Sequence, residues 1–88
     1  MGDVMIVYKI MPEDPEADLG SIKEEVKKIA IKHGELRDTN EEKVAFGLKA
    51  IIAKIVLPDE GGIVDKLEEE LNTISGIQSA ESVDITLV

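Results

Sequence analysis

The hydropathy pattern of this chain switches between two periods, and that succession constrains its fold more than any other feature. Residues 4–11 form an almost continuous apolar run rich in β-branched side chains, which predicts a strand with both faces covered. Residues 18–33 then carry apolar side chains at helical spacing, separated by lysines and glutamates. The second half repeats this succession, with an apolar run at 48–57 and an amphipathic stretch at 63–75. The sequence therefore predicts two strand–helix units, although the two halves share no convincing repeated sequence.

Two less apolar segments complete the predicted sheet. Residues 36–44 are polar and charged, which is typical of an edge strand, because charges discourage pairing with another chain. Val83, Ile85 and Leu87 alternate with polar residues and predict a half-buried final strand. The resulting β-α-β-β-α-β order predicts an α+β, ferredoxin-like sandwich with a four-stranded antiparallel sheet. Right-handed crossovers place both helices on one face, and the two apolar strands are expected in the centre.

The helix boundaries are predicted from residues that suit helix ends. Asp18 is expected to cap the first helix by accepting hydrogen bonds from free backbone N–H groups. Gly34 follows that helix at the usual place of a left-handed C-terminal cap, and Gly76 is expected to end the second helix in the same way.

One face of the predicted sheet carries no helix. Lys9, Lys49 and Lys54 interrupt the apolar strands and are therefore candidates for this face. At 88 residues, the chain is expected to form one domain, residues 1–88. Its longest apolar run is too short to cross a bilayer, and its start lacks a signal-peptide pattern. A cytoplasmic protein that does not associate with a membrane is therefore predicted.

The charge and the residue types exclude several classes of function. The formal net charge is −9, cysteine is absent, and His33 is the only histidine. A transition-metal site, a cysteine nucleophile and a bound cofactor are therefore not expected. The negative charge and the scarcity of aromatic side chains, limited to Tyr8 and Phe46, argue against direct binding of nucleic acid. His33 is expected to be a surface or capping group at a helix end.

The acidic and glycine-rich segments favour structural interpretations. The acidic residues of 13–18 lack the spacing of a complete calcium loop, so they are expected to form a solvated loop with a helix cap. Residues 68–70 are three glutamates and predict a solvated helix face. Gly61-Gly62 lacks the spacing of a phosphate-binding loop and follows two acidic residues, which favours a plain turn before the second helix.

Phe46-Gly47 is the segment with the strongest functional signal. Phe46 is the only phenylalanine and falls in a predicted loop between the polar and the apolar strand. Burial of large apolar side chains favours a core plug at a corner of the sheet. An exposed aromatic anchor for a protein partner is the alternative, since such residues are frequent in binding hot spots. Gly47 would supply an unusual backbone angle in either case.

Several short motifs together resemble the archaeal translation elongation factor 1-beta family. They are Gly2-Asp3-Val4, Met11-Pro12-Glu13, Val44-Ala45-Phe46-Gly47-Leu48-Lys49-Ala50 and Asp59-Glu60-Gly61-Gly62. The resemblance covers essentially the whole chain, and the segment from Ala45 to Ala50 is its most specific part. It implies the same fold and a guanine-nucleotide exchange factor for elongation factor 1-alpha, which is not an enzyme.

The resemblance also implies how exchange works and which residues contact the partner. Release of GDP is promoted by disturbing the magnesium and phosphate site of the GTPase, after which GTP binds. Phe46, Gly47 and Lys49 fall in the matching segment and are the expected partner-binding residues. The eukaryotic domain uses a lysine near its C-terminus at the magnesium site, whereas residues 84–88 contain none. Either another group takes that role, or release depends more on displacement of the switch segments.

A second hypothesis follows from the fold alone. Ferredoxin-like domains support many functions, including regulatory modules that bind small molecules. Such a module would bind its ligand at a strand or helix interface, and an amino acid would then stabilise it against heat.

Overall fold

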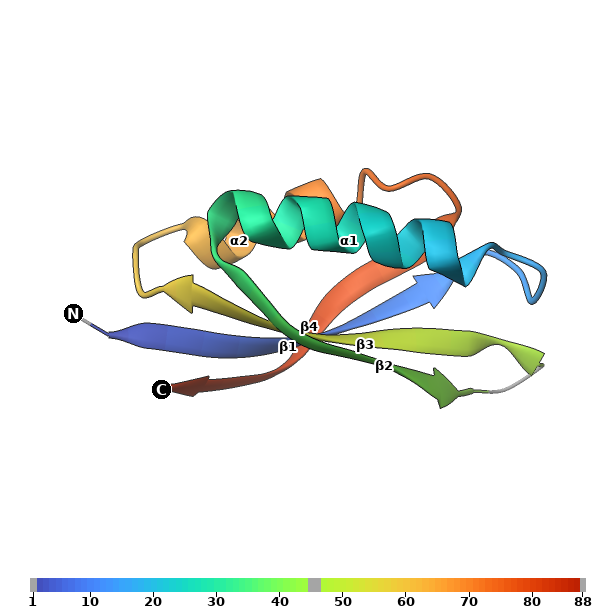
Figure 1. Ribbon diagram of the computed structural model, residues 1–88, viewed down its shortest axis with the longest axis horizontal. Coiled ribbons are helices and arrows are strands. Elements are labelled where there is room, and N and C mark those ends of the chain that lie inside the picture. Colours follow the sequence, from blue (N-terminus) through green and yellow to red (C-terminus); the bar gives the residue numbers. More distant parts are fainter. Residues whose placement is uncertain (1, 45–46, 88) are drawn as a thin grey trace.

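A computed structural model of the chain describes residues 2–44 and 47–87. The elements in chain order are β1 (Asp3–Pro12), α1 (Leu19–His33), β2 (Glu35–Lys43), β3 (Lys49–Pro58), α2 (Ile63–Leu71) and β4 (Ile77–Leu87). The strands form one antiparallel sheet, and both helices lie on the same face of it (Figure 1). The predicted β-α-β-β-α-β, ferredoxin-like fold is confirmed.

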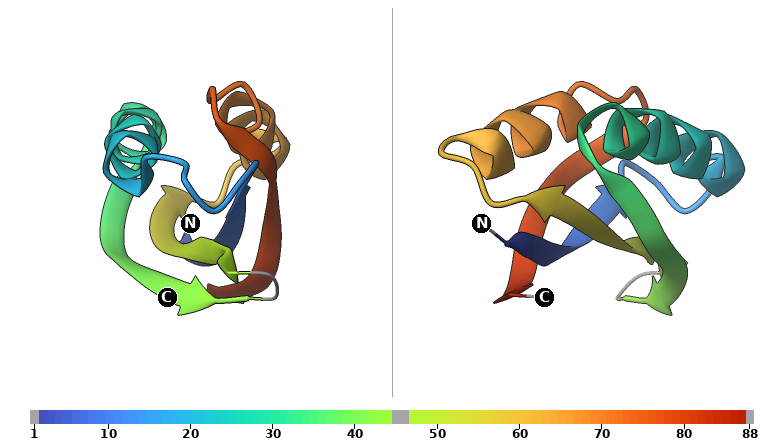
Figure 2. Two further views of the ribbon diagram at one scale, coloured as in Figure 1. Left: turned by 90° about the vertical axis from the view of Figure 1, so that its right-hand side faces the viewer. Right: turned by 60° about the vertical axis from the view of Figure 1, so that its left-hand side comes forward.

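The strand order is β2-β3-β1-β4, so the two apolar strands occupy the centre, as predicted. Alternate residues of β1 point toward the helices, and the other residues point away from them. Both views of Figure 2 show the two helices above this strongly twisted sheet. The largest fully buried side chains are Tyr8, Ile6, Ile10, Ile51, Ile55, Leu57, Leu67, Leu71, Val26 and Pro12.

Tyr8 joins the sheet to α2 from within this core. Its side chain is fully buried, and its hydroxyl donates a hydrogen bond to the carbonyl oxygen of Val64, 3.2 Å away. Burial, and after it the negative charges of Glu68 and Asp65, raise the pKa of Tyr8 to about 12. Tyr8 is therefore neutral at physiological pH and acts as a structural donor.

The register of β1 and β3 tests which lysines lie on the helix-free face. Lys9 lies opposite Ile52 and Lys54 opposite Val7, in phase with the residues that point away from the helices. Both predictions are confirmed. Lys49 lies two residues before the buried Ile51, so it shares the phase of the helix-bearing side, and the prediction for Lys49 is wrong.

The start of α1 confirms one predicted cap, and its end corrects another. Asp18 accepts hydrogen bonds from the backbone N–H of Ser21 at 3.3 Å and from its hydroxyl at 3.0 Å. The backbone bond is the main cause of a lowered Asp18 pKa. Gly34 has a φ of −172°, so the predicted left-handed cap is wrong. Glycine is needed there because an added Cβ would lie 2.1 Å from the carbonyl oxygen of Val56.

The second helix ends earlier than predicted. α2 stops at Leu71, and Gly76, at φ +91°, lies in the following turn instead of closing the helix. Asn72 explains the early stop. Its side-chain amide donates to the carbonyl oxygens of Glu68 at 2.8 Å and Ala80 at 3.1 Å, and its side-chain oxygen accepts from the N–H of Ala80 at 2.9 Å. This side chain joins the end of α2 to β4.

The last part of β4 is more exposed than predicted. Val83, Ile85 and Leu87 are 52%, 54% and 75% exposed, so the prediction of a half-buried strand is wrong for this part. The register with β1 shifts between Val7 and Tyr8, and beyond this irregularity β4 runs away from both helices (Figure 1). Its apolar side chains are consequently left uncovered by the helix layer.

Candidate functional site

β2 ends and β3 begins at the same end of the sheet, at the right of Figure 1. Lys43 and Lys49 are direct cross-strand partners where the two strands end. The N–H of Val44 donates a hydrogen bond to the carbonyl oxygen of Leu48 at 2.8 Å, which holds the backbones of these two residues together beyond the last strand pair. We call Lys43, Val44, Gly47, Leu48 and Lys49 the hairpin tip; together they line an open hollow of about 350 Å³.

Gly47 has a left-handed backbone at the hairpin tip. Its φ is +75°, a region that residues with a Cβ rarely adopt. Apart from the two chain neighbours of Gly47, the described residues place no heavy atom within 4 Å of the position that a Cβ would occupy. Glycine is therefore needed for its backbone conformation and not for lack of space, as the sequence predicted.

The hairpin tip carries positive charge on an acidic protein. Two lysines near the tip are paired with glutamates of β2: Lys9 on β1 lies 3.9 Å from Glu42, and Lys23 on α1 lies 2.6 Å from Glu41. Within residues 2–44 and 47–87, the ion pairs closer than 4.0 Å include neither lysine of the tip. Lysines placed directly opposite each other repel, so this pair costs stability and provides a local excess of positive charge.

The Glu41 carboxylate lies within the electrostatic influence of two lysines, its partner Lys23 and the tip residue Lys49. The hydrogen bond and charge of Lys23 are the main causes of its lowered pKa, and the charge of Lys49 lowers it further. Glu41 is thus held in its charged form beside the tip.

The expected site residues have different outcomes. Gly47 and Lys49 lie together at the hairpin tip. Phe46 lies outside the described residues, so its role as anchor or core plug stays a prediction. Lys43 is a tip residue that sequence reasoning missed, because its pairing with Lys49 follows only from the register of the hairpin. The signal in the sequence was a lysine directly before the apolar Val44, at the end of the polar segment 36–44.

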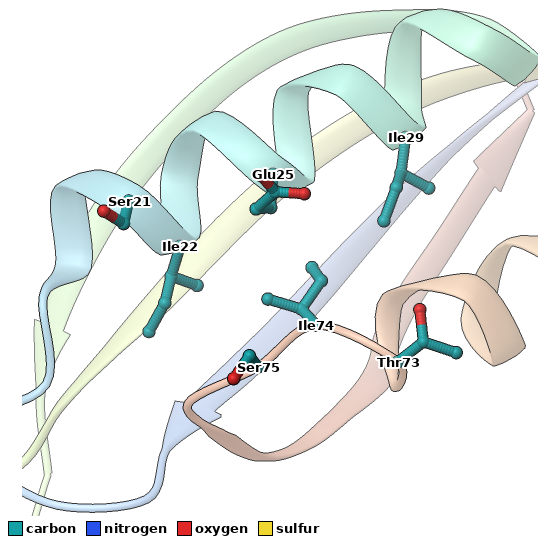
Figure 3. Close-up of a pocket in the computed structure, with 7 residues that line it drawn as sticks. All are labelled: Ser21, Ile22, Glu25, Ile29, Thr73, Ile74 and Ser75. Carbon is teal, nitrogen blue, oxygen red and sulfur yellow. The ribbon is translucent and has the colours of Figure 1, made fainter.

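A groove between α1 and the segment after α2 is a second candidate (Figure 3). Its volume is about 340 Å³, and its lining residues are Ser21, Ile22, Glu25, Ile29, Thr73, Ile74 and Ser75. The hydroxyl of Ser21 bonds Asp18, and that of Thr73 donates to the carbonyl oxygen of Glu70 at 2.6 Å. The polar groups of this groove are thus largely engaged in local structure, which gives a small ligand few groups to bind.

The remaining titratable clusters have structural roles. Glu70 on α2 binds both His33 and Lys32, the latter at 2.8 Å, so it joins the ends of the two helices. Hydrogen bonds from Lys32 and then His33 lower the pKa of Glu70. Glu68 accepts a hydrogen bond from the N–H of Ser82 at 3.3 Å. Glu68 and Glu70 thus belong to the predicted solvated face of α2, and they also make surface contacts that join α2 to β4 and to α1.

The described residues form neither a metal centre nor a membrane-spanning helix. No group of three or more acidic or histidine side chains there is arranged to hold a metal ion. Likewise, no helix of the described ranges has the length and hydrophobicity needed to cross a membrane.

A solved structure with a similar fold supports the architecture only. The ACT domain from GTP pyrophosphokinase of Chlorobium tepidum matches with a TM-score of 0.64 over 92% of this chain and 99% of that chain. The sequence identity is 12%, which is too low to carry function between the two proteins.

Comparison with proteins of similar sequence identifies the family, which the structural match does not. The chain is 41% identical to an elongation factor 1-beta of Archaeoglobus fulgidus over 100% of both chains. It is 43% identical to that of Methanoculleus marisnigri over 100% of both chains, and 43% identical to that of Sulfolobus acidocaldarius over 96% of this chain and 94% of the other. The family model of the EF-1 guanine nucleotide exchange domain matches residues 5–88. The chain therefore belongs to the elongation factor 1-beta family of guanine-nucleotide exchange factors, which act in translation without being enzymes.

Proposed function

We propose that this chain promotes the exchange of GDP for GTP on elongation factor 1-alpha, and that the hairpin tip contacts that GTPase. Membership of the exchange-factor family supports the partner. The tip is supported by one structural observation: the two lysines opposed at its base, Lys43 and Lys49, lie beside the left-handed Gly47. An arrangement that costs stability is typical of a functional surface. The proposed place of action is the cytoplasm, with residues 1–88 acting as one exchange domain.

The mechanism is a shift of conformational population in the GTPase. Binding energy is directed at a state of the partner that holds magnesium and GDP poorly, so GDP leaves without covalent chemistry. Lys43 and Lys49 would pair with carboxylate or phosphate oxygens near that site, and Gly47 would hold the connection in the shape that presents Phe46. GTP then binds the emptied GTPase and displaces the exchange factor.

Release of fluorescent GDP from the cognate elongation factor 1-alpha tests the function. Catalytic amounts of this chain are expected to accelerate release, and no acceleration would refute the proposed function. Lys43→Ala combined with Lys49→Ala is expected to slow exchange by about tenfold or more, because two charged contacts are lost. The double variant Lys27→Ala with Lys66→Ala makes the same charge change at exposed helix positions and is expected to stay within about twofold of wild type.

Phe46→Ala tests the aromatic anchor separately. An outward anchor predicts that exchange slows by about tenfold or more while the free energy of unfolding changes by less than about 1 kcal/mol. Both quantities are measured on the same preparation, by GDP release and by urea unfolding. A loss of about 3–5 kcal/mol in stability would instead assign Phe46 to the core.

A further inference from the structure

The end of β2 that carries Lys43 has no buried side chain to hold it. Leu36 and Thr39 are the partly buried residues of this strand, and the side chains of residues 40–43 are all exposed. β2 lies at the edge of the sheet, so its backbone pairs with β3 alone. Side-chain contacts with other elements therefore decide how firmly the end of β2 is fixed.

Glu41 makes such a contact, from β2 to α1. Its carboxylate accepts a hydrogen bond from Nζ of Lys23 at 2.6 Å, and the two side chains are 38% and 32% exposed. Glu41 lies opposite Ile51, which is fully buried beneath the helices, so Glu41 is on the helix-bearing side of the sheet. Because the pair is partly withdrawn from water, salt screens it less than an ion pair in full solvent. The pair ties the end of β2 to the helix layer.

The same carboxylate lies beside both lysines of the hairpin tip. Lys43 follows Glu41 by two residues on β2, so the two side chains share one side of the sheet. Lys49 precedes Ile51 by two residues on β3, which makes it the diagonal cross-strand neighbour of Glu41, a separation of about 7–8 Å. In agreement, the charge of Lys49 contributes to the lowered pKa of Glu41. Glu41 is thus a negative charge among three lysines.

We propose that Glu41 is a positioning residue for exchange, which holds the hairpin tip in the arrangement that elongation factor 1-alpha recognises. Lys43 and Lys49 are direct cross-strand partners, and their repulsion would drive the two side chains apart. A carboxylate on the same face offsets that repulsion and, through Lys23, fixes the strand end to α1. A tip that is ordered before it meets its partner loses less conformational entropy on binding. This inference rests on the proposed function, since the GTPase is the partner to which the tip is presented.

Glu42 provides a matched control for Glu41. Both are exposed glutamates of β2 that pair with a lysine. Glu42, however, pairs with Lys9 and lies opposite Ala50, on the helix-free face. Glu41→Gln and Glu42→Gln therefore remove the same charge from neighbouring positions on opposite faces, and Glu41 is the one that shares its face with the tip lysines.

Release of fluorescent GDP at increasing concentrations of the exchange factor separates binding of the GTPase from the release step. Glu41→Gln is expected to raise the half-saturating concentration by about threefold to tenfold, because the tip must then be ordered on binding. The maximal rate is expected to stay within about twofold of wild type, because the tip contacts themselves are kept. Glu42→Gln is expected to stay within about twofold of wild type in both quantities.

Glu41→Asp tests whether the charge is what matters at this position. This variant keeps the carboxylate, and the flexible side chain of Lys23 can follow its shorter reach. It is therefore expected to recover most of the loss seen with Glu41→Gln.

Nuclear magnetic resonance tests the arrangement without the GTPase. The side-chain Cε resonance of Lys49 should shift in acid as the Glu41 carboxyl is protonated, at a pH below the ordinary pKa of 4.5. The shift should be absent in Glu41→Gln and kept in Glu42→Gln. A Lys49 transition that persists in Glu41→Gln would overturn the proposal.

The kinetic outcomes distinguish this role from the exchange function itself. Equal effects of Glu41→Gln and Glu42→Gln would overturn the role of Glu41 and leave the exchange function intact, as would a Glu41→Asp variant as impaired as Glu41→Gln. A lower half-saturating concentration for Glu41→Gln would also overturn it, because Glu41 would then only weaken the positive charge of the tip. A wild-type chain that does not accelerate GDP release would refute the proposed function, and the Lys49 resonance would still decide whether Glu41 orders the tip.

Discussion

Single residues decide where the elements of this chain end. Asp18 starts α1 through side-chain bonds to Ser21, in agreement with its position before the helical pattern. Gly34 ends α1 for a different reason from the predicted one, because the chain passes closely beside Val56 and leaves no room for a Cβ. Asn72 stops α2 by bonding β4. The residue type is informative in all three cases, but its physical role is visible only where the neighbouring element is known.

Gly34→Ala is expected to destabilise the protein by about 1–3 kcal/mol, a usual cost of overpacking. The added methyl group would meet the carbonyl oxygen of Val56 and the side chain of Leu57, 2.1 Å and 2.9 Å from the Cβ position. Urea unfolding measures the loss. Gly61→Ala is the control, because beyond its two chain neighbours no heavy atom of residues 2–44 and 47–87 lies within 4 Å of its Cβ position. Equal stability of the two variants would show that the backbone shifts at little cost near Gly34.

At the scale of elements, the two helices are joined to each other at one point and to the sheet at others. Glu70 on α2 binds Lys32 and His33 at the end of α1. Asn72 and Tyr8 join α2 to the neighbouring strands. A nine-residue helix such as α2 is marginal by itself, so these contacts and its buried leucines hold it in place.

The Glu70 contact predicts a dependence of stability on pH. Its pKa is lowered in the folded chain, so its stabilising effect is complete above the ordinary value of about 4.5 and is lost as the pH falls through the lower folded-state value. Glu70→Gln is therefore expected to reduce the free energy of unfolding at pH 6, with a difference from wild type that shrinks in acid. Urea unfolding at a series of pH values measures this.

The control for that series is Glu69→Gln, which removes the same charge from an exposed neighbouring position of α2. Its difference from wild type is expected to be smaller at pH 6. A constant difference between Glu70→Gln and wild type across the acidic range would contradict the proposed role of the carboxylate.

At the scale of the whole molecule, charge and exposed apolar surface are separated along the sheet. The hairpin tip presents lysines at one end, whereas the apolar part of β4 lies at the other. The net charge of −9 gives the whole molecule a negative long-range field, although the tip lysines form a local positive region within it. Such a field speeds association with a basic partner surface and has little effect on how long the complex lasts.

Association with elongation factor 1-alpha is therefore expected to slow several-fold between about 0.05 M and about 0.5 M salt, because salt screens the field. Stopped-flow measurement of GDP release at increasing exchange-factor concentration gives the association rate constant. Release from the GTPase alone at each salt concentration is the control. An association rate that does not change with salt would show that the net charge has no steering role.

The sequence by itself determined the elements, their order in the sheet and the family. Each apolar period is a local property that burial enforces, and the two most apolar runs must occupy the centre of the sheet because only central strands are covered on both faces. Several short motifs, of which the segment with Phe46, Gly47 and Lys49 is the most specific, indicate the family without any knowledge of contacts, and the family model matches residues 5–88.

Only the tertiary structure decided what depends on register and on packing between elements. The pairing of Lys43 with Lys49, the early end of α2 and the exposure of Leu87 all require knowing which residue lies opposite which. Local periodicity cannot supply this information, because a bulge or a crossing element shifts the register without changing the apolar pattern. The exposed end of β4 arises in the same way, since the twist of the sheet carries an apolar strand end beyond the reach of the helices.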